Sequence, residues 1–95
     1  MFIVDLKYKV PLEEIYSHMG EHMKFLRKYY KLNKFLASGR KVPRTGGIFL
    51  LLSESRAEVD SIIEEDPFFI HNLAEFTITE FNTSQMHPGL KVILE

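Results

Sequence analysis

Hydrophobic and polar residues alternate at both ends of the main body of the chain. Between Phe2 and Lys9, apolar side chains recur at every second position, and most positions between them are charged. A period of two is typical of a β-strand with one buried face. A similar alternation begins at Ala74, continues through Phe76 and Ile78, and predicts a last strand that ends near Phe81.

A period of three to four residues predicts two helices. After Pro11, which suits the first turn of a helix, the stripe that would face a core is Leu12, Ile15, Met19, His22, Leu26 and Tyr29. Gly20 interrupts this helix, and close packing is the only role that the sequence offers for it. The second helix is expected to begin at Ser55, which forms a capping box with Glu58, and to end before Pro67.

Two more strands are expected between these helices. Asn33–Ser38 forms one, closed by Gly39, and the unbroken apolar run Ile48–Leu52 forms the other. Residues 40–47 contain two glycines and a proline and predict a hairpin loop. The resulting order, β-α-β-β-α-β, predicts an α+β fold of the ferredoxin-like, split βαβ class with an antiparallel sheet.

The apolar run Ile48–Leu52 also bears on assembly. A strand without a polar face is covered on both sides, and two short helices cover only one face of a sheet. A chain of 95 residues without cysteine has neither a large core nor a disulfide to stabilise it. We therefore expect a homodimer that forms through the sheet.

The domain is expected to span residues 1–83, followed by a tail over residues 84–95. The tail contains a turn around Pro88 and then a short alternating segment formed by Leu90, Val92 and Leu94. This alternation predicts either a strand at the edge of the sheet or an arm that reaches a partner subunit.

Composition narrows the class of partner. The net charge is −1 and the cations are interspersed with acids, so we expect no nucleic-acid partner. The apolar segment Phe2–Val4 is too short for a signal peptide or a membrane span, which predicts a cytoplasmic protein without a membrane partner. No phosphate loop or dinucleotide fingerprint occurs in the sequence, and we expect no cofactor.

Two residues depart from the pattern around them. His22 occupies the apolar stripe of the first helix, where a buried imidazole needs a hydrogen-bond partner. Asp66 ends a run of three acids at the end of the second helix, where the helix dipole disfavours anions, although an aspartate before proline also initiates turns. Because both helices cover the same side of the sheet, the two side chains can meet. An aspartate that fixes the tautomer of a histidine is suited to general acid–base catalysis, and the alternative is a structural hydrogen bond in the core.

These residues lie in segments that resemble the YciI-like (YCII-related) family. The segments are Glu21–Leu26, which contains His22, Ser38–Gly39 at the end of the second strand, and Asp66–Phe68. The resemblance covers about residues 1–81 and implies a ferredoxin-like fold of the dimeric α+β barrel type. It also implies an active site in which His22 and Asp66 are the catalytic residues.

One departure from the family concerns the substrate. Many relatives carry an arginine three residues before the histidine, and this chain has Met19 there. We expect the loop to supply the cation instead, through Arg40 or Arg44. The substrate-binding residues predicted for a small-molecule ligand are Ser38, Gly39, Arg40, Arg44 and Phe68.

The segment His18–His22 matches the H-x-x-E-H zinc signature of inverse zincins. That class of peptidase needs a further carboxylate and a much larger catalytic domain, so we interpret the match as a coincidence and predict no metal. A looser metal site formed by His18, His22 and Asp66 is the alternative.

Three functions are compatible with these patterns. The first is a small-molecule enzyme of the lyase or isomerase type, in which His22 is the general base and Asp66 orients it. The second is a non-catalytic, ligand-binding or structural homodimer in which the pair is only a hydrogen bond. The third is an interaction module in which the apolar third strand serves association alone.

Overall fold

Four antiparallel strands form one sheet in the order β2–β3–β1–β4. The computed structural model describes residues 1–94, and its strands are β1 (Phe2–Tyr8), β2 (Phe35–Arg40), β3 (Gly46–Leu51) and β4 (Ala74–Glu80). On the central strand β1, Val4 pairs with Phe49 of β3 on one side and with Ile78 of β4 on the other. This topology confirms the predicted α+β, ferredoxin-like class.

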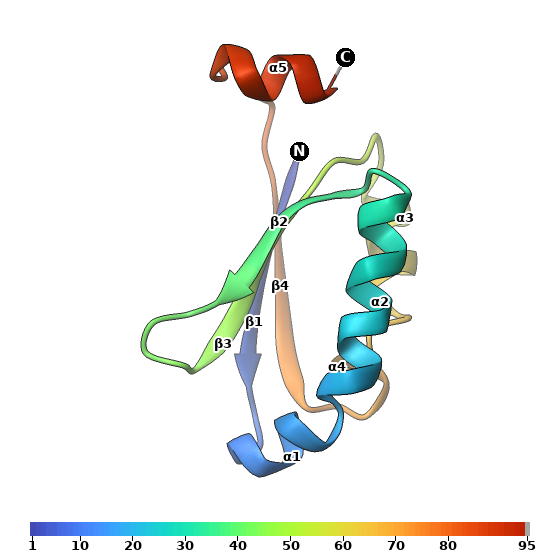
Figure 1. Ribbon diagram of the computed structural model, residues 1–95, viewed down its shortest axis with the longest axis vertical. Coiled ribbons are helices and arrows are strands. Elements are labelled where there is room, and N and C mark those ends of the chain that lie inside the picture. Colours follow the sequence, from blue (N-terminus) through green and yellow to red (C-terminus); the bar gives the residue numbers. More distant parts are fainter. Residues whose placement is uncertain (95) are drawn as a thin grey trace.

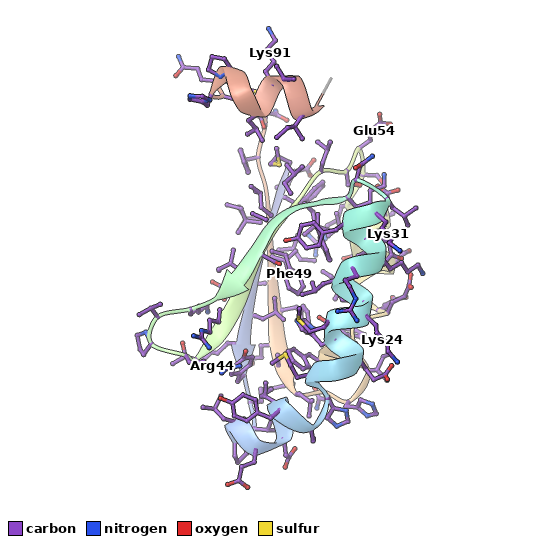
Figure 2. The ribbon with its side chains drawn as sticks, in the orientation of Figure 1. Lys24, Lys31, Arg44, Phe49, Glu54 and Lys91 are labelled. Carbon is purple, nitrogen blue, oxygen red and sulfur yellow. The ribbon has the colours of Figure 1, made fainter. Side chains whose placement is uncertain are left out.

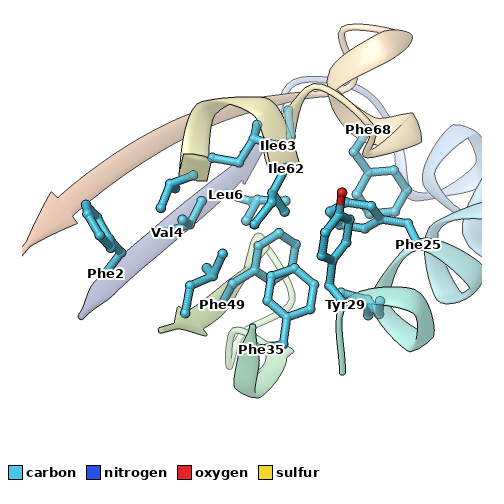
Figure 3. Packing of buried hydrophobic residues seen from close by; sticks show 14 of the residues in the cluster. Phe2, Val4, Leu6, Phe25, Tyr29, Phe35, Phe49, Ile62, Ile63 and Phe68 are labelled. Carbon is cyan, nitrogen blue, oxygen red and sulfur yellow. The ribbon is translucent and has the colours of Figure 1, made fainter. Parts of the chain in front are cut away.

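The helices cover one face of this sheet and enclose the core (Figure 1). The helices of this layer are α1 (Leu12–Ser17), α2 (Met19–Lys31), α3 (Arg56–Ile63) and the short α4 (Pro67–Ile70), and a further helix, α5 (Pro88–Leu94), lies outside the layer. Phe2, Val4 and Leu6 are almost completely buried against the helices, as their alternation predicts. Figure 3 shows aromatic rings filling the space between α2 and the sheet, where the ring centroids of Phe35 and Phe49 are 5.1 Å apart.

The opposite face of the sheet carries apolar side chains that none of the helices in residues 1–94 covers. Ile3 is 37% exposed there, and its neighbours Ile48 and Leu50 on β3 are partly exposed. Among the described residues, therefore, the apolar run of β3 is fully covered only on the side of Phe49.

The first helix differs from the single helix that we predicted, because the chain breaks at His18 into α1 and α2. His18 has φ −109° and ψ 5°, and the hydroxyl of Ser17 bonds back to the carbonyl of Glu14 at 2.7 Å. Such a bond competes with helical hydrogen bonding. The suggestion that Gly20 allows close packing is also wrong, since a Cβ at that position would meet no heavy atom within 4 Å.

The capping box at the second helix is present. The Ser55 hydroxyl accepts a hydrogen bond from the backbone N–H of Glu58, at 3.1 Å. This helix ends at Ile63, earlier than the predicted stop before Pro67, and Pro67 instead occupies the first turn of α4, a helix that the sequence did not predict. Strand β2 extends to Arg40, so Ser38 and Gly39 lie inside the strand and not at its end.

The tail forms a helix where an edge strand was one of two predictions. Pro88 begins α5, and the backbone N–H of Gly89 donates to Nδ1 of His87 at 3.0 Å, which favours the start of a helix. Figure 1 shows α5 standing beyond the end of the sheet, away from the other helices. Of the helices in residues 1–94, none has the length and apolar composition to cross a membrane.

Candidate active site

A cavity of about 270 Å³ lies between α2 and the strands of the sheet. The sequence-predicted residues that line it are His22, Ser38, Gly39, Arg40, Arg44 and Phe68. Asp66 is the one predicted site residue that does not line it, because it lies behind the imidazole and is completely buried. The structure thus brings together all seven of the residues singled out from the sequence.

His22 and Asp66 form a buried hydrogen bond. Nδ1 of His22 lies 2.8 Å from Oδ1 of Asp66, although the two residues are 44 positions apart in the chain. Because a carboxylate oxygen only accepts hydrogen bonds, this contact places a proton on Nδ1 and leaves Nε2 as the nitrogen available to a ligand. His22 is 7% exposed and lines the cavity, so the imidazole is the part of the pair that a ligand can reach.

The backbone of α4 holds Asp66 in position. Its Oδ1 also accepts a hydrogen bond from the backbone N–H of Phe68, at 3.0 Å, which makes Asp66 the N-cap of this short helix. The carboxylate therefore stands at the favourable end of α4 as well as at the unfavourable end of α3. Its second oxygen, Oδ2, is buried without a hydrogen-bond partner among the described residues.

Aromatic rings fix the plane of the imidazole. The ring of Phe68 stacks on His22 with a centroid distance of 4.0 Å and an angle of 6° between the planes. Phe49 stacks at 5.9 Å. The position of the imidazole is thus set by packing as well as by its bond to Asp66.

Arg40 and Arg44 bring positive charge to the lining of the cavity. Arg40 pairs with Gly47 across the β2–β3 ladder, and Arg44 lies in the turn that joins the two strands (Figure 2). Ser38 shares a hydrogen bond of 2.7 Å with the hydroxyl of Tyr30. Met19 also lines the cavity and brings no charge to it.

Comparison with known proteins identifies the family. The YCII-related domain matches residues 1–82 of the chain. The chain belongs to the YCII-related family. No match was found among curated proteins.

A solved structure shows the same fold as this YCII-related chain. It is 5-chloro-2-hydroxyhydroquinone dehydrochlorinase from Burkholderia phenoliruptrix AC1100, in complex with 2,5-dihydroxybenzoquinone. The TM-score is 0.72 at 20% sequence identity, over 86% of this chain and 94% of the other. At this identity the likeness concerns the fold.

The two histidines of the segment that matches the zinc signature, His18 and His22, make different contacts in the structure. The ring of His18 stacks on His71 at a centroid distance of 4.2 Å, whereas His22 is bonded to Asp66. No group of three or more metal-ligating side chains gathers anywhere in residues 1–94, so the alternative site of His18, His22 and Asp66 is not assembled there.

Sequence reasoning missed two tyrosines that support the lining residues. Tyr30 bonds to Ser38, and Tyr16 bonds to Arg44. Tyr16 is 52% exposed and Tyr30 is 38% exposed. No local pattern in the sequence marks either contact, because each joins a helix to a distant strand or turn.

Proposed function

We propose that this YCII-related protein is a small-molecule enzyme of the lyase or isomerase type, with His22 as its general acid–base. The observation that carries the proposal is a histidine–aspartate pair of which only the imidazole borders a cavity. A volume of about 270 Å³ is slightly below the usual range of about 300–1,000 Å³ for ligand pockets, so the ligand is small.

The proposed chemistry begins with neutral His22. Its Nδ1–H is held by Asp66, and the lone pair of Nε2 takes a proton from an acidic C–H or O–H group of the substrate. When the proton comes from C–H, the electron pair left behind moves onto a neighbouring carbonyl oxygen and gives an enolate, and when it comes from O–H, the pair stays on that oxygen as a phenolate. Asp66 stabilises the imidazolium that forms.

The intermediate then has two outcomes. In an isomerase, the imidazolium returns its proton to a different substrate atom. In a lyase, the electron pair of the enolate expels a leaving group from the neighbouring carbon, and the imidazolium can protonate that group. General acid–base catalysis of this kind contributes about 10²–10⁴-fold to a rate.

The structural neighbour supports the class of ligand. Its name describes a dehydrochlorinase, and it holds 2,5-dihydroxybenzoquinone. We propose that the YCII-related chain accepts oxygenated compounds of similar size, and that it needs no cofactor because the residues at the cavity suffice for proton transfer.

A solvent-exchange experiment tests this function. Small keto acids and phenolic acids are incubated with the protein in D₂O, and NMR records deuterium uptake and loss of leaving groups. We expect exchange or elimination with the wild type. With His22→Gln, the rate should be lower by a factor of at least about 10². His87→Gln, in the tail, is the matched control and should behave as wild type. Equal rates with wild type and His22→Gln for every compound would contradict the proposal.

A ligand-binding protein without catalysis is the second candidate. The stack of His22 on Phe68 and the complete burial of Asp66 favour it, because a pair that is embedded in the core also stabilises the fold. In the same experiment, this function predicts compounds that bind and shift resonances around the cavity but exchange no proton.

We further propose that the protein is a homodimer through the uncovered face of the sheet. Ile3, Ile48 and Leu50 form an apolar patch on that face, and a second copy of the sheet would bury it. Sedimentation should give a dimer for the wild type and a monomer for Ile48→Lys. The control is Ile70→Lys, which alters an apolar residue of α4 that is 60% exposed. A monomeric wild type would refute this assembly.

A cytoplasmic location completes the proposal. The absence of cysteine supports it, because small secreted domains commonly depend on disulfides. Recovery of the protein outside the cytoplasmic fraction of its cell would contradict this location.

A further inference from the structure

The turn between β2 and β3 presents a positively charged side chain to the cavity from a fixed backbone. The carbonyl of Thr45 accepts from the N–H of Tyr8 on β1 at 3.0 Å, and the N–H of Lys41 donates to the carbonyl of Gly46 at 2.8 Å. These bonds tie both ends of the turn to the sheet. The backbone of Arg44, which lies between these two hydrogen bonds in the turn, is therefore held in a defined position.

Tyr16 of α1 holds the guanidinium of Arg44. The central carbon of the guanidinium lies 4.6 Å from the centre of the tyrosine ring, and Nη1 donates a hydrogen bond of 2.7 Å to the hydroxyl. One side chain thus contacts the guanidinium through both its ring and its hydroxyl. An arginine constrained in this way loses less conformational freedom when it binds a ligand.

The charge of Arg44 has no carboxylate partner among the described residues. Its Nε is buried without a hydrogen-bond acceptor, although it belongs to a group that stays protonated at all ordinary pH. A buried donor without an acceptor costs free energy, and a ligand oxygen would remove that cost.

The cavity has the composition of an anion site. Arg40 and Arg44 both line it, and of the aspartates and glutamates in residues 1–94 none does. Its other walls include apolar side chains, among them Leu6, Leu26 and Phe49. Apolar walls with two guanidinium groups suit an organic anion better than an inorganic one.

We infer that Arg44, positioned by Tyr16, binds the negatively charged oxygen of an organic acid, either a carboxylate or an ionised ring hydroxyl. The inference rests on the proposed function in that it names the substrate class of the same cavity. The acid oxygen meets Arg44, and the body of the ligand extends along the apolar walls toward Nε2 of His22.

Matched acids and amides test the charge requirement. Binding of benzoate, benzamide and 2,5-dihydroxybenzoquinone is measured by NMR titration at low and high salt. With the wild type, benzoate should bind at least about ten-fold more tightly than benzamide, since a charge-assisted hydrogen bond contributes about 1.5 kcal/mol or more and 1.4 kcal/mol corresponds to ten-fold. High salt should reduce this preference. Equal affinity for benzoate and benzamide would overturn the inference.

Variants of the two side chains locate the site. Arg44→Gln should abolish the preference for benzoate, and Arg44→Lys should restore only part of it, because lysine lacks the planar fork of arginine. The control Arg27→Gln removes a cation of α2 that does not line the cavity, and it should leave the preference unchanged. An unchanged preference in Arg44→Gln would place the anion elsewhere.

Tyr16 is a positioning residue in this scheme, and its variants separate that role from a purely structural one. Tyr16→Leu should weaken benzoate binding almost as much as Arg44→Gln does, although the arginine is still present. Tyr16→Phe keeps the ring and should recover part of the affinity. Equal benzoate affinity in Tyr16→Leu and wild type would remove Tyr16 from the site.

His22→Gln distinguishes failure of this inference from failure of the proposed function. The variant should keep the preference for acids while it loses proton exchange. A wild type that prefers acids but exchanges no proton would refute the enzyme and leave the anion site. A wild type that exchanges protons without any preference for acids would refute the anion site and leave the enzyme.

Discussion

Asp66 offers a quantitative test of the buried pair, because its replacement by alanine removes two contacts at once. The first is the cap of α4, where the carboxylate accepts from the N–H of Phe68 at 3.0 Å. The second is the bond to Nδ1 of His22, an atom that would be left without its acceptor. Asparagine at the same position keeps a side-chain oxygen for both contacts and removes the charge.

The expected loss follows from the two contacts. Loss of an N-cap costs about 0.5–2 kcal/mol, and a buried donor without an acceptor costs about 1–3 kcal/mol. Asp66→Ala should therefore lower the free energy of unfolding by roughly 2–4 kcal/mol, which corresponds to a fall in Tm of at least about 8 °C in a domain of this size. Asp66→Asn should lower the free energy of unfolding by about 1 kcal/mol. The NH₂ group of asparagine, a hydrogen-bond donor, would occupy the buried site of Oδ2, which has no partner among the described residues.

Urea denaturation followed by far-UV circular dichroism provides the measurement, and the protein concentration is kept constant because dimerisation would couple to unfolding. Asp60→Ala is the control, since it removes an exposed pair with Arg56 on α3 whose contribution is about 0.3–0.5 kcal/mol. If Asp66→Ala unfolds within about 0.5 kcal/mol of the wild type, the buried pair does not exist as described.

Two further predictions use the same denaturation assay. Gly20→Ala should raise the free energy of unfolding by about 1 kcal/mol, because the new Cβ meets no atom within 4 Å. Gly46→Ala should lower the free energy of unfolding strongly, because its Cβ would lie 1.7 Å from a backbone oxygen of β1. Effects of the same sign in the two variants would contradict the packing. Hydrogen bonds from Lys28 and then Tyr29 hold the pKa of the Glu65 carboxyl below its usual value. The stabilisation that these hydrogen bonds give is complete above the usual glutamate pKa and is lost as the pH falls through the lowered pKa of the folded state. Glu65→Gln should therefore flatten the acid limb of the plot of unfolding free energy against pH. Identical acid limbs in the variant and the wild type would refute the contact.

The sheet could be predicted from the sequence because the period of each strand is local information. Phe2, Val4 and Leu6 had to share one face, and the structure buries all three. The meeting of His22 and Asp66 could be anticipated as well, since each residue was out of place on its own element and the fold class puts both helices on one face. An anomaly that local structure does not explain is informative about distant contacts.

Three features could not be predicted by the same reasoning. Asp66 and Pro67 are compatible with the end of one helix and with the start of another, and only the folded chain shows that α3 already ends at Ile63 and that these two residues begin α4. The contact between Tyr16 and Arg44 joins positions 28 residues apart, neither of which departs from its local pattern. The tail is too short for periods of two and 3.6 to be told apart, so its alternation did not reveal α5.

The turn over residues 41–45 has a consequence for how such a protein could diversify. It is anchored to the sheet on both sides, whereas the histidine and its carboxylate belong to the helical layer. Under the proposed function, exchange of the turn sequence would change which ligands bind beside Arg44 and would leave His22 and Asp66 in place. We expect descendants of such a gene to switch ligands through this hairpin while their scaffold stays the same.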